Sequence, residues 1–196
     1  MWNEPGSESS KRLESLSIPD NVSAMVREIS AGGVVFREIA GTWNVALIEP
    51  RKDEPRTDEQ KIASPKTATT KAARIRAVLT LPKGLVDPGE KPQETAVREV
   101  REETGVEAET IVKLSDSKYV YVRKWGDGER VFKIVSFYLM RYVSGEIDDI
   151  KPEMRIEVKR ALWVPLADAA KQLAYSNDRK LLRQAAEYVE TNGLGV

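Results

Sequence analysis

Three glutamates share one face of a predicted helix in the middle of the chain. Pro92 suits the first turn of this helix, and Gly105 suits its C-terminal end. With about 100° between successive residues, Glu99, Glu102 and Glu103 fall within about 100° of one another. Like charges at this spacing destabilise a helix by ~0.2–0.5 kcal/mol per pair, a cost that a divalent cation among the carboxylates would offset. The alternative is an acidic face that only meets solvent.

A neighbouring face of the same helix can pack against a core. It carries Ala96, Val97, Val100 and Thr104. Arg98 lies four residues from both Glu94 and Glu102, so we expect its guanidinium to pair with these two carboxylates. The pattern therefore predicts a helix that is held by its apolar face and directs its acids outward.

Composition limits the chemistry that these carboxylates can join. The chain has 196 residues, with no cysteine and no histidine. This excludes disulfides, thiol catalysis, cysteine-held zinc and every Ser-His or Cys-His arrangement. The 31 basic and 31 acidic residues cancel, which argues against general nucleic-acid coating or attachment to an acidic membrane surface. Catalysis must rely on carboxylates, lysine, tyrosine or hydroxyls, with oxygen-held Mg²⁺, or Mn²⁺ in its place, as the natural metal.

The spacing around the helix matches a known signature. The matching residues are Gly84, then after five residues Glu90, then after seven residues Arg98-Glu99-Val100, then after one residue Glu102-Glu103, then after one more Gly105-Val106. This pattern resembles the Nudix box, and every specified position is filled. The resemblance extends over roughly residues 29–190. It implies an α/β/α sandwich on a mixed β-sheet, an α+β fold in which the box forms a loop–helix–loop.

The resemblance also implies an activity, the hydrolysis of a nucleoside diphosphate linked to another moiety, X. Glu99, Glu102 and Glu103 match the box glutamates that hold magnesium. Gly84 matches the glycine whose carbonyl can reach the metal, and Glu90 matches a more peripheral acid. Arg98 matches the arginine that orients a catalytic glutamate. Metal ions would neutralise the pyrophosphate and activate a water, whose proton a carboxylate accepts.

Features outside the box are similar to those of diadenosine polyphosphate hydrolases. Lys83 stands in a Leu-Pro-Lys-Gly sequence that resembles the start of their box. Glu157 precedes Trp163 by six residues, the spacing of an outside glutamate that joins the metal site and the catalysis in that group. Tyr175, eighteen residues after Glu157 and expected on a helix, resembles a tyrosine that stacks on adenine. Lys133 resembles a lysine that reaches the phosphates.

Each of these outside residues has a simpler interpretation. Lys83 would then be an exposed loop lysine, and Glu157 a solvated acid beside Lys159 and Arg160. Tyr175 would cover the core below its helix, and Lys133 would lie on the exposed face of its strand. Tyr119, Tyr121 and Trp125 are candidates for a second base-stacking partner, although aromatic residues in strands more often serve packing.

The elements that must position these residues follow from periodicity and turn signals. We expect strands at 29–37, 45–48, 77–81, 111–122, 130–143 and 161–164, and helices from Pro165 to about Tyr175 and over 177–190. We expect residues 1–22 to form a flexible polar extension and residues 23–196 to form a single domain. The basic composition at 51–76 marks an insertion that is expected to be disordered and to overhang the site, with an ordinary solvated linker as the alternative. The run from Val131 to Met140 is expected to be a central strand.

The function predicted from the whole sequence is a magnesium-dependent pyrophosphohydrolase of dinucleoside polyphosphates such as diadenosine tetra- to hexaphosphate. The alternatives are hydrolysis of a diphosphoinositol polyphosphate or a nucleoside triphosphate, a non-catalytic nucleotide sensor, and removal of pyrophosphate from RNA 5′ ends. The expected partner is a small nucleotide or polyphosphate, with nucleic acid ranked lower and the chain a monomer or homodimer. No apolar run of about 18 residues and no secretory signal are seen, so the expected location is the cytoplasm, without a membrane span.

Overall fold

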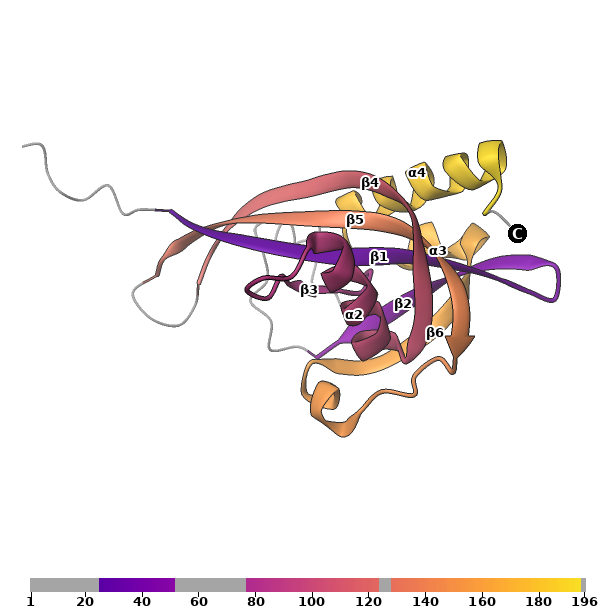
Figure 1. Ribbon diagram of the computed structural model, residues 1–196, viewed down its shortest axis with the longest axis horizontal. Coiled ribbons are helices and arrows are strands. Elements are labelled where there is room, and N and C mark those ends of the chain that lie inside the picture. Colours follow the sequence, from indigo (N-terminus) through magenta and orange to yellow (C-terminus); the bar gives the residue numbers. More distant parts are fainter. Residues whose placement is uncertain (1–24, 52–76, 124–127, 195–196) are drawn as a thin grey trace, which may run out of the picture.

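The computed structural model describes residues 25–51, 77–123 and 128–194. Within these ranges, six strands and their flanking helices follow one another along the chain (Figure 1). The strands are β1 (Val26–Ile39), β2 (Thr42–Pro50), β3 (Lys83–Leu85), β4 (Val106–Val122), β5 (Arg130–Gly145) and β6 (Val158–Pro165). The helices are α2 (Pro92–Thr104), the 3-10 helix η1 (Pro152–Ile156), α3 (Leu166–Gln172) and α4 (Ser176–Asn192).

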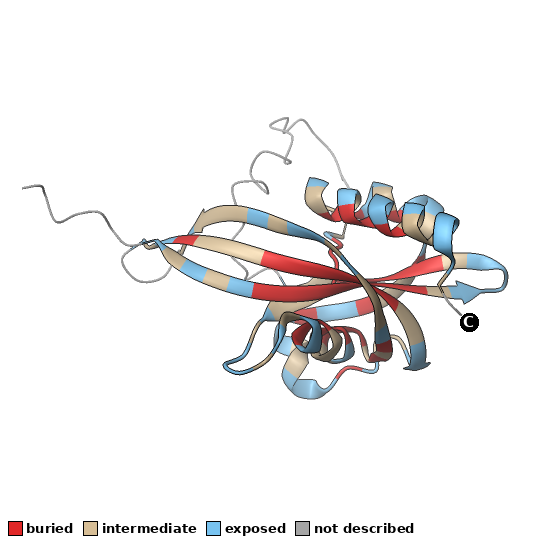
Figure 2. Ribbon diagram, turned by 45° about the horizontal axis from the view of Figure 1, so that its top comes forward, coloured by how far each residue is buried: buried red, intermediate tan, exposed pale blue. Residues whose placement is uncertain are grey.

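The six strands form one mixed sheet, as predicted. The strand order is β4-β5-β1-β2-β6, and the short β3 pairs with β1. β1 and β5 run parallel, whereas the other neighbours are antiparallel. Helix α2 covers one face, and α3 and α4 cover the other (Figure 2). The arrangement confirms the expected α/β/α sandwich.

Strand β1 contributes to the core on both faces of the sheet. Val34 and Phe36 belong to the cluster that includes residues of α3 and α4, whereas Ala31 and Val35 pack in the cluster that includes α2. This alternation is the two-residue period of a strand, and both sets are fully buried because helices cover both faces. β1 is therefore the element against which the other layers are positioned.

The expected strands are largely confirmed, with two corrections. The hairpin at 29–37 and 45–48 is β1 and β2, and the apolar run from Val131 to Met140 lies in β5, between β4 and β1. The strand expected at 77–81 is wrong: only isolated bridges occur there, and the regular pairing with β1 begins at β3. β4 begins at Val106 rather than 111, because it enters the sheet directly after Gly105 and pairs with β5 through several bulges.

The helices also follow the sequence pattern. In α4, Leu181, Leu182 and Ala185 are buried, and Val189 packs against the same cluster. Tyr175 was expected at the end of the preceding helix, but α3 ends at Gln172 and Tyr175 is the N-cap of α4. No helix in the three described ranges combines the length and apolar character needed to cross a membrane.

An isolated β-bridge joins Ile48, which precedes residues 52–76 in the sequence, to Thr80, which follows them. Ile48 and Thr80 exchange both backbone hydrogen bonds, at N···O distances of 3.0 and 2.9 Å. The expected extension at 1–22, the insertion apart from Arg51, and Trp125 lie outside the described residues.

Gly105 ends α2 in a conformation and an environment that both require glycine. Its φ of 80° is left-handed, and a Cβ there would lie 2.7 Å from the carbonyl oxygens of Glu146 and Asp149. Gly41, in the β1–β2 turn, has a similar φ of 75° but open space around the corresponding position.

We predict that Gly105→Ala lowers the free energy of unfolding by about 3 kcal/mol, because it adds overpacking to backbone strain. Gly41→Ala should cost only about 1 kcal/mol, from the strain alone. Urea unfolding followed by circular dichroism measures both. Equal losses would show that the space around Gly105 relaxes freely.

Candidate active site

One cavity of about 460 Å³ is lined by most of the residues singled out for a site. Its wall includes, from the predicted set, Lys83, Gly84, Arg98, Glu99, Glu102, Glu103, Tyr121, Lys133, Glu157 and Tyr175. These residues come from β3, α2, β4, β5, the end of η1 and the start of α4. The fold thus places the acidic, basic and aromatic candidates around one space, although they lie far apart in sequence.

Glu99 is the most confined of the box carboxylates. It is 7% exposed, and the backbone of Gly84 packs directly on its carboxylate, so that a Cβ at Gly84 would overlap it. Burial raises the pKa of Glu99, the guanidinium of Arg98 opposes this, and the charges of Glu102 and Glu157 add to it. A larger residue at position 84 would therefore displace the carboxylate of Glu99.

Glu103 connects α2 to β3. Its side chain is buried, and its Oε2 accepts a hydrogen bond from the backbone N–H of Lys83 at 2.6 Å. Glu102, one residue earlier, keeps 34% of its side chain exposed and also lines the cavity. The expected shared face of Glu99, Glu102 and Glu103 is present, with the burial decreasing toward Glu102.

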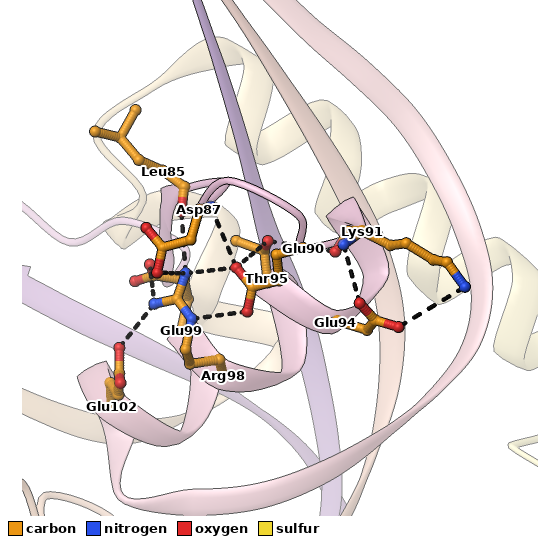
Figure 3. Close-up of polar contacts among 9 residues, drawn as sticks. All are labelled: Leu85, Asp87, Glu90, Lys91, Glu94, Thr95, Arg98, Glu99 and Glu102. Carbon is orange, nitrogen blue, oxygen red and sulfur yellow. Dashed lines mark hydrogen bonds and ion pairs between the residues drawn. The ribbon is translucent and has the colours of Figure 1, made fainter.

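Arg98 contacts several members of the acidic cluster at once (Figure 3). Its Nε and Nη2 donate to the two oxygens of Glu90 at 2.9 Å each, which forms a bidentate pair. Its Nη1 donates to Glu99 at 2.7 Å and to Glu102 at 2.9 Å. Nη2 also donates to the carbonyl of Leu85 at 3.0 Å. One guanidinium thus fixes the loop before α2 and two carboxylates on the helix.

The expected pairing of Arg98 with Glu94 is wrong. Glu94 lies at the start of α2, where it accepts from the N–H of Lys91 at 3.0 Å and has the Lys91 ammonium at 3.9 Å. Glu90 takes the place of Glu94 because the preceding loop folds back over Arg98 (Figure 3). Helical spacing could not show this contact, since Glu90 lies outside the helix.

Glu157 lies at the end of η1 and lines the same cavity. The simpler interpretation placed it beside Lys159 and Arg160, but both of these cations pair with Glu49, at 2.7 Å. The charge of Glu157 is instead felt by Glu99. The structure therefore groups Glu157 with the box glutamates.

The predicted binding residues lie on the cavity wall with a range of exposures. Lys133, on β5, keeps 16% of its side chain exposed, so it does not lie on an open strand face. Tyr121, on β4, and Tyr175, at the N-cap of α4, are half-buried. Tyr119 lines the cavity beside Tyr121, with ring centroids 6.5 Å apart.

Sequence reasoning missed Glu28 and Arg123. Glu28, near the start of β1, lines the cavity and accepts hydrogen bonds from Tyr121 and Arg123, at 2.8 Å each. The two-residue period of a strand, followed back from Ser30, would have placed Glu28 on the same face of the sheet as Ser30. Arg123 follows β4 and carried no such signal. Asp178, buried in the first turn of α4, is a further missed carboxylate of the wall.

The donor set fits a hard divalent cation by its chemistry, although the carboxylates do not converge in metal geometry. Among residues 25–51, 77–123 and 128–194, no group of three acids is arranged as a metal site. The oxygens of Glu99 and Glu102 point at Arg98 instead. Glu99, Glu102, Glu103 and Glu157 nevertheless border the cavity together with Gly84 and a single guanidinium, and oxygen donors of this kind suit a hard cation.

Comparison with known proteins settles the family. A family model described as NUDIX domain matches residues 56–185. The chain belongs to the Nudix family. The Mycobacterium tuberculosis protein MutT4 is 35% identical over 167 residues, which are 84% of this Nudix chain and 57% of MutT4. The chain therefore spans little more than half of that relative.

Two further proteins are similar to this Nudix chain. The Mus musculus bis(5'-nucleosyl)-tetraphosphatase [asymmetrical] is 32% identical over 114 residues, 56% of this chain and 71% of the mouse protein. The crystal structure of a C. elegans Ap4A hydrolase binary complex aligns with a TM-score of 0.55 at 22% identity, over 84% of this chain and 98% of the worm protein. At that identity the structural likeness establishes the fold alone.

The loop acid of this Nudix box makes a testable contribution to stability. Hydrogen bonds from Arg98 and then Thr95 lower the pKa of Glu90 to about 2, from an ordinary value of 4.5. A carboxyl whose pKa falls on folding stabilises the protein above its unfolded pKa, and this stability is lost as the pH falls toward the folded pKa.

We predict that wild type exceeds Glu90→Gln in Tm at pH 7, and that the difference narrows steadily below pH 5, as the wild-type carboxyl is protonated. Thermal melts in metal-free buffer with EDTA measure it. Glu94→Gln, an exposed acid of the same helix, should show a small difference throughout. A Glu90→Gln difference that does not change with pH would contradict the role assigned to the Arg98 pair.

Proposed function

We propose that this protein is a metal-dependent hydrolase that cleaves a phosphoanhydride bond of a dinucleoside polyphosphate, such as diadenosine tetraphosphate. One observation carries the proposal: a single cavity is bordered by the box glutamates, by two lysines and by tyrosines from two different elements. Acids suit a cation, lysines suit phosphates, and aromatic rings suit bases. The 32% identity to the mouse tetraphosphatase supports the same substrate class.

We assign Mg²⁺, with Mn²⁺ as a substitute, to the acidic side of this cavity. Its ligands would be Glu99, Glu102, Glu103 and Glu157, with the carbonyl of Gly84. Bound there, the cation would neutralise phosphate charge and lower the pKa of a water. Glu99 and Glu102 would exchange part of their contact with Arg98 for the cation, while Glu90 keeps the guanidinium in place.

The chain's own residues complete the chemistry. The water adds to phosphorus as the P–O bond to the leaving phosphate breaks, and one proton passes to a carboxylate oxygen. Glu102 and Glu157 are the two cavity glutamates that solvent reaches most freely. Lys83 and Lys133 face the phosphates, and Tyr175 and Tyr121 or Tyr119 receive the two bases. The two products together retain all the phosphates of the substrate.

A panel of substrates tests the proposal. Diadenosine tetraphosphate, a nucleoside triphosphate, a diphosphoinositol polyphosphate and a 5′-triphosphate RNA are incubated with protein and Mg²⁺, and the products are separated by anion-exchange chromatography. We expect the highest kcat/KM for diadenosine tetraphosphate, with AMP and ATP or two ADP as products. Exhaustive EDTA should abolish turnover, and Mg²⁺ or Mn²⁺ should restore it. Turnover that survives EDTA would overturn the metal requirement, and a clear preference for another substrate would overturn the assigned substrate.

We predict that Glu102→Gln and Glu103→Gln each lower kcat by about 10² or more, because each removes a charge that the reaction needs while keeping the side-chain shape. Thermal melts of the metal-free variants should show intact folding. Glu94→Gln is the matched control, since Glu94 lies on the same helix and pairs only with Lys91 among the interactions described. Kinetics within threefold of wild type for both variants would refute the assignment.

A further inference from the structure

A second polar cluster lies in the cavity, centred on Glu28 rather than on the box. Oε1 of Glu28 accepts from Nη2 of Arg123 at 2.8 Å, and Oε2 accepts from the hydroxyl of Tyr121 at 2.8 Å. The ammonium of Lys133 lies 3.7 Å from the same Oε2. Only 14% of the Glu28 side chain is exposed. A single carboxylate thus contacts two groups of the cavity wall, Tyr121 and Lys133, and also Arg123, which follows β4.

The sheet register explains why these groups meet. Glu28 on β1 is paired with Lys133 on β5, and Lys133 is paired in turn with Tyr119 on β4. Paired residues direct their side chains to the same face, and Tyr121 follows Tyr119 by the two-residue period of a strand. The backbone therefore brings the side chains together, but it leaves their rotamers to be set by their contacts.

The charges around Glu28 keep its carboxylate ionised and able to accept hydrogen bonds. Burial alone would raise the pKa of Glu28, but hydrogen bonds from Arg123 and Tyr121 and the charge of Lys133 lower it, so the carboxylate is ionised at neutral pH. Burial and the bond to Glu28 raise the pKa of Tyr121 to about 12, so its hydroxyl remains a donor. Arg123 also pairs with Glu129, at 2.8 Å.

We infer that Glu28 is a positioning residue for substrate binding, which holds Tyr121 and Lys133 in the orientation that the base and the phosphates of the substrate require. The inference rests on the proposed function. When Tyr121 and Lys133 are ordered before substrate binds, binding no longer costs the conformational entropy of these two side chains. Glu28 itself does not contact the box glutamates in any described interaction, so it affects affinity and not the chemical step.

A purely electrostatic role makes the opposite prediction. Glu28 is a negative charge in a cavity for an anionic substrate, so its removal would make the cavity more positive and lower KM. If Glu28 positions its neighbours, its removal raises KM in spite of the gain in positive charge. The sign of the change in KM therefore distinguishes the two roles.

Steady-state kinetics of Glu28→Gln with diadenosine tetraphosphate and Mg²⁺ test the inference. We expect KM to rise about tenfold and kcat to stay within threefold of wild type. Glu49→Gln is the matched control: Glu49 is also an ion-paired strand carboxylate, 12% exposed and held by two cations, but it does not line the cavity. Its KM should be unchanged. An unchanged or lower KM in Glu28→Gln would overturn the inference.

A double-mutant cycle shows whether Glu28 acts through its partners. In a Lys133→Ala, Tyr121→Phe background, Glu28→Gln should change KM by less than twofold, because the groups that it positions are gone. A full tenfold effect in that background would overturn the positioning role. If Glu28→Gln does not fold, Tyr121→Phe alone decides: it keeps the ring and removes the bond to Glu28, and we expect KM to rise about threefold, whereas no change would overturn the inference.

The outcomes separate this inference from the proposed function. A wild-type protein that hydrolyses another substrate of the panel refutes the assigned substrate, and the same kinetics are then measured with the substrate that it prefers. A wild-type protein that is active on diadenosine tetraphosphate, with an unaltered Glu28→Gln variant, refutes only the role of Glu28.

Discussion

The arrangement of the site depends on one guanidinium within an excess of carboxylates. Arg98 contacts Glu90, Glu99 and Glu102 and a carbonyl of β3, so it joins the loop, the helix and the strand of the box. Without it, the acids of α2 would repel one another and the preceding loop would lose its attachment. Because the contact with Glu90 is bidentate, the guanidinium remains fixed when its bonds to the other acids change.

Strand β1 places the same stretch of chain in the core and in the cavity. Its middle residues are fully buried between the two helical layers, and its start brings Glu28 into the cavity wall. β3 attaches to β1 by only three paired positions, yet it carries Gly84 against Glu99. The stability of the fold and the geometry of the site therefore rest on the same backbone hydrogen bonds.

The sequence predicted what periodicity and fixed spacing control, and it failed where the contacts are long-range. The shared face of Glu99 and Glu103 follows from helical geometry, and the ends of α2 follow from Pro92 and Gly105. The pairing of Arg98 with Glu90 depends on a loop that folds back, which no helical spacing encodes. Glu28 escaped notice because its partners lie more than ninety residues away in sequence, so only the strand register shows their proximity.

The bridge between Ile48 and Thr80 has a consequence for the evolution of this chain. Two backbone hydrogen bonds join Ile48 to Thr80, and only a few residues separate Thr80 from β3 and the box. The bridge holds Ile48 and Thr80 together, so the start of the path to β3 and the box is set by these two residues whatever the number of residues in the sequence between Arg51 and Ala77. Doubling the length of such a connection adds only about 0.6 kcal/mol of loop-closure entropy, so a change in its length is expected to leave the glutamates in place.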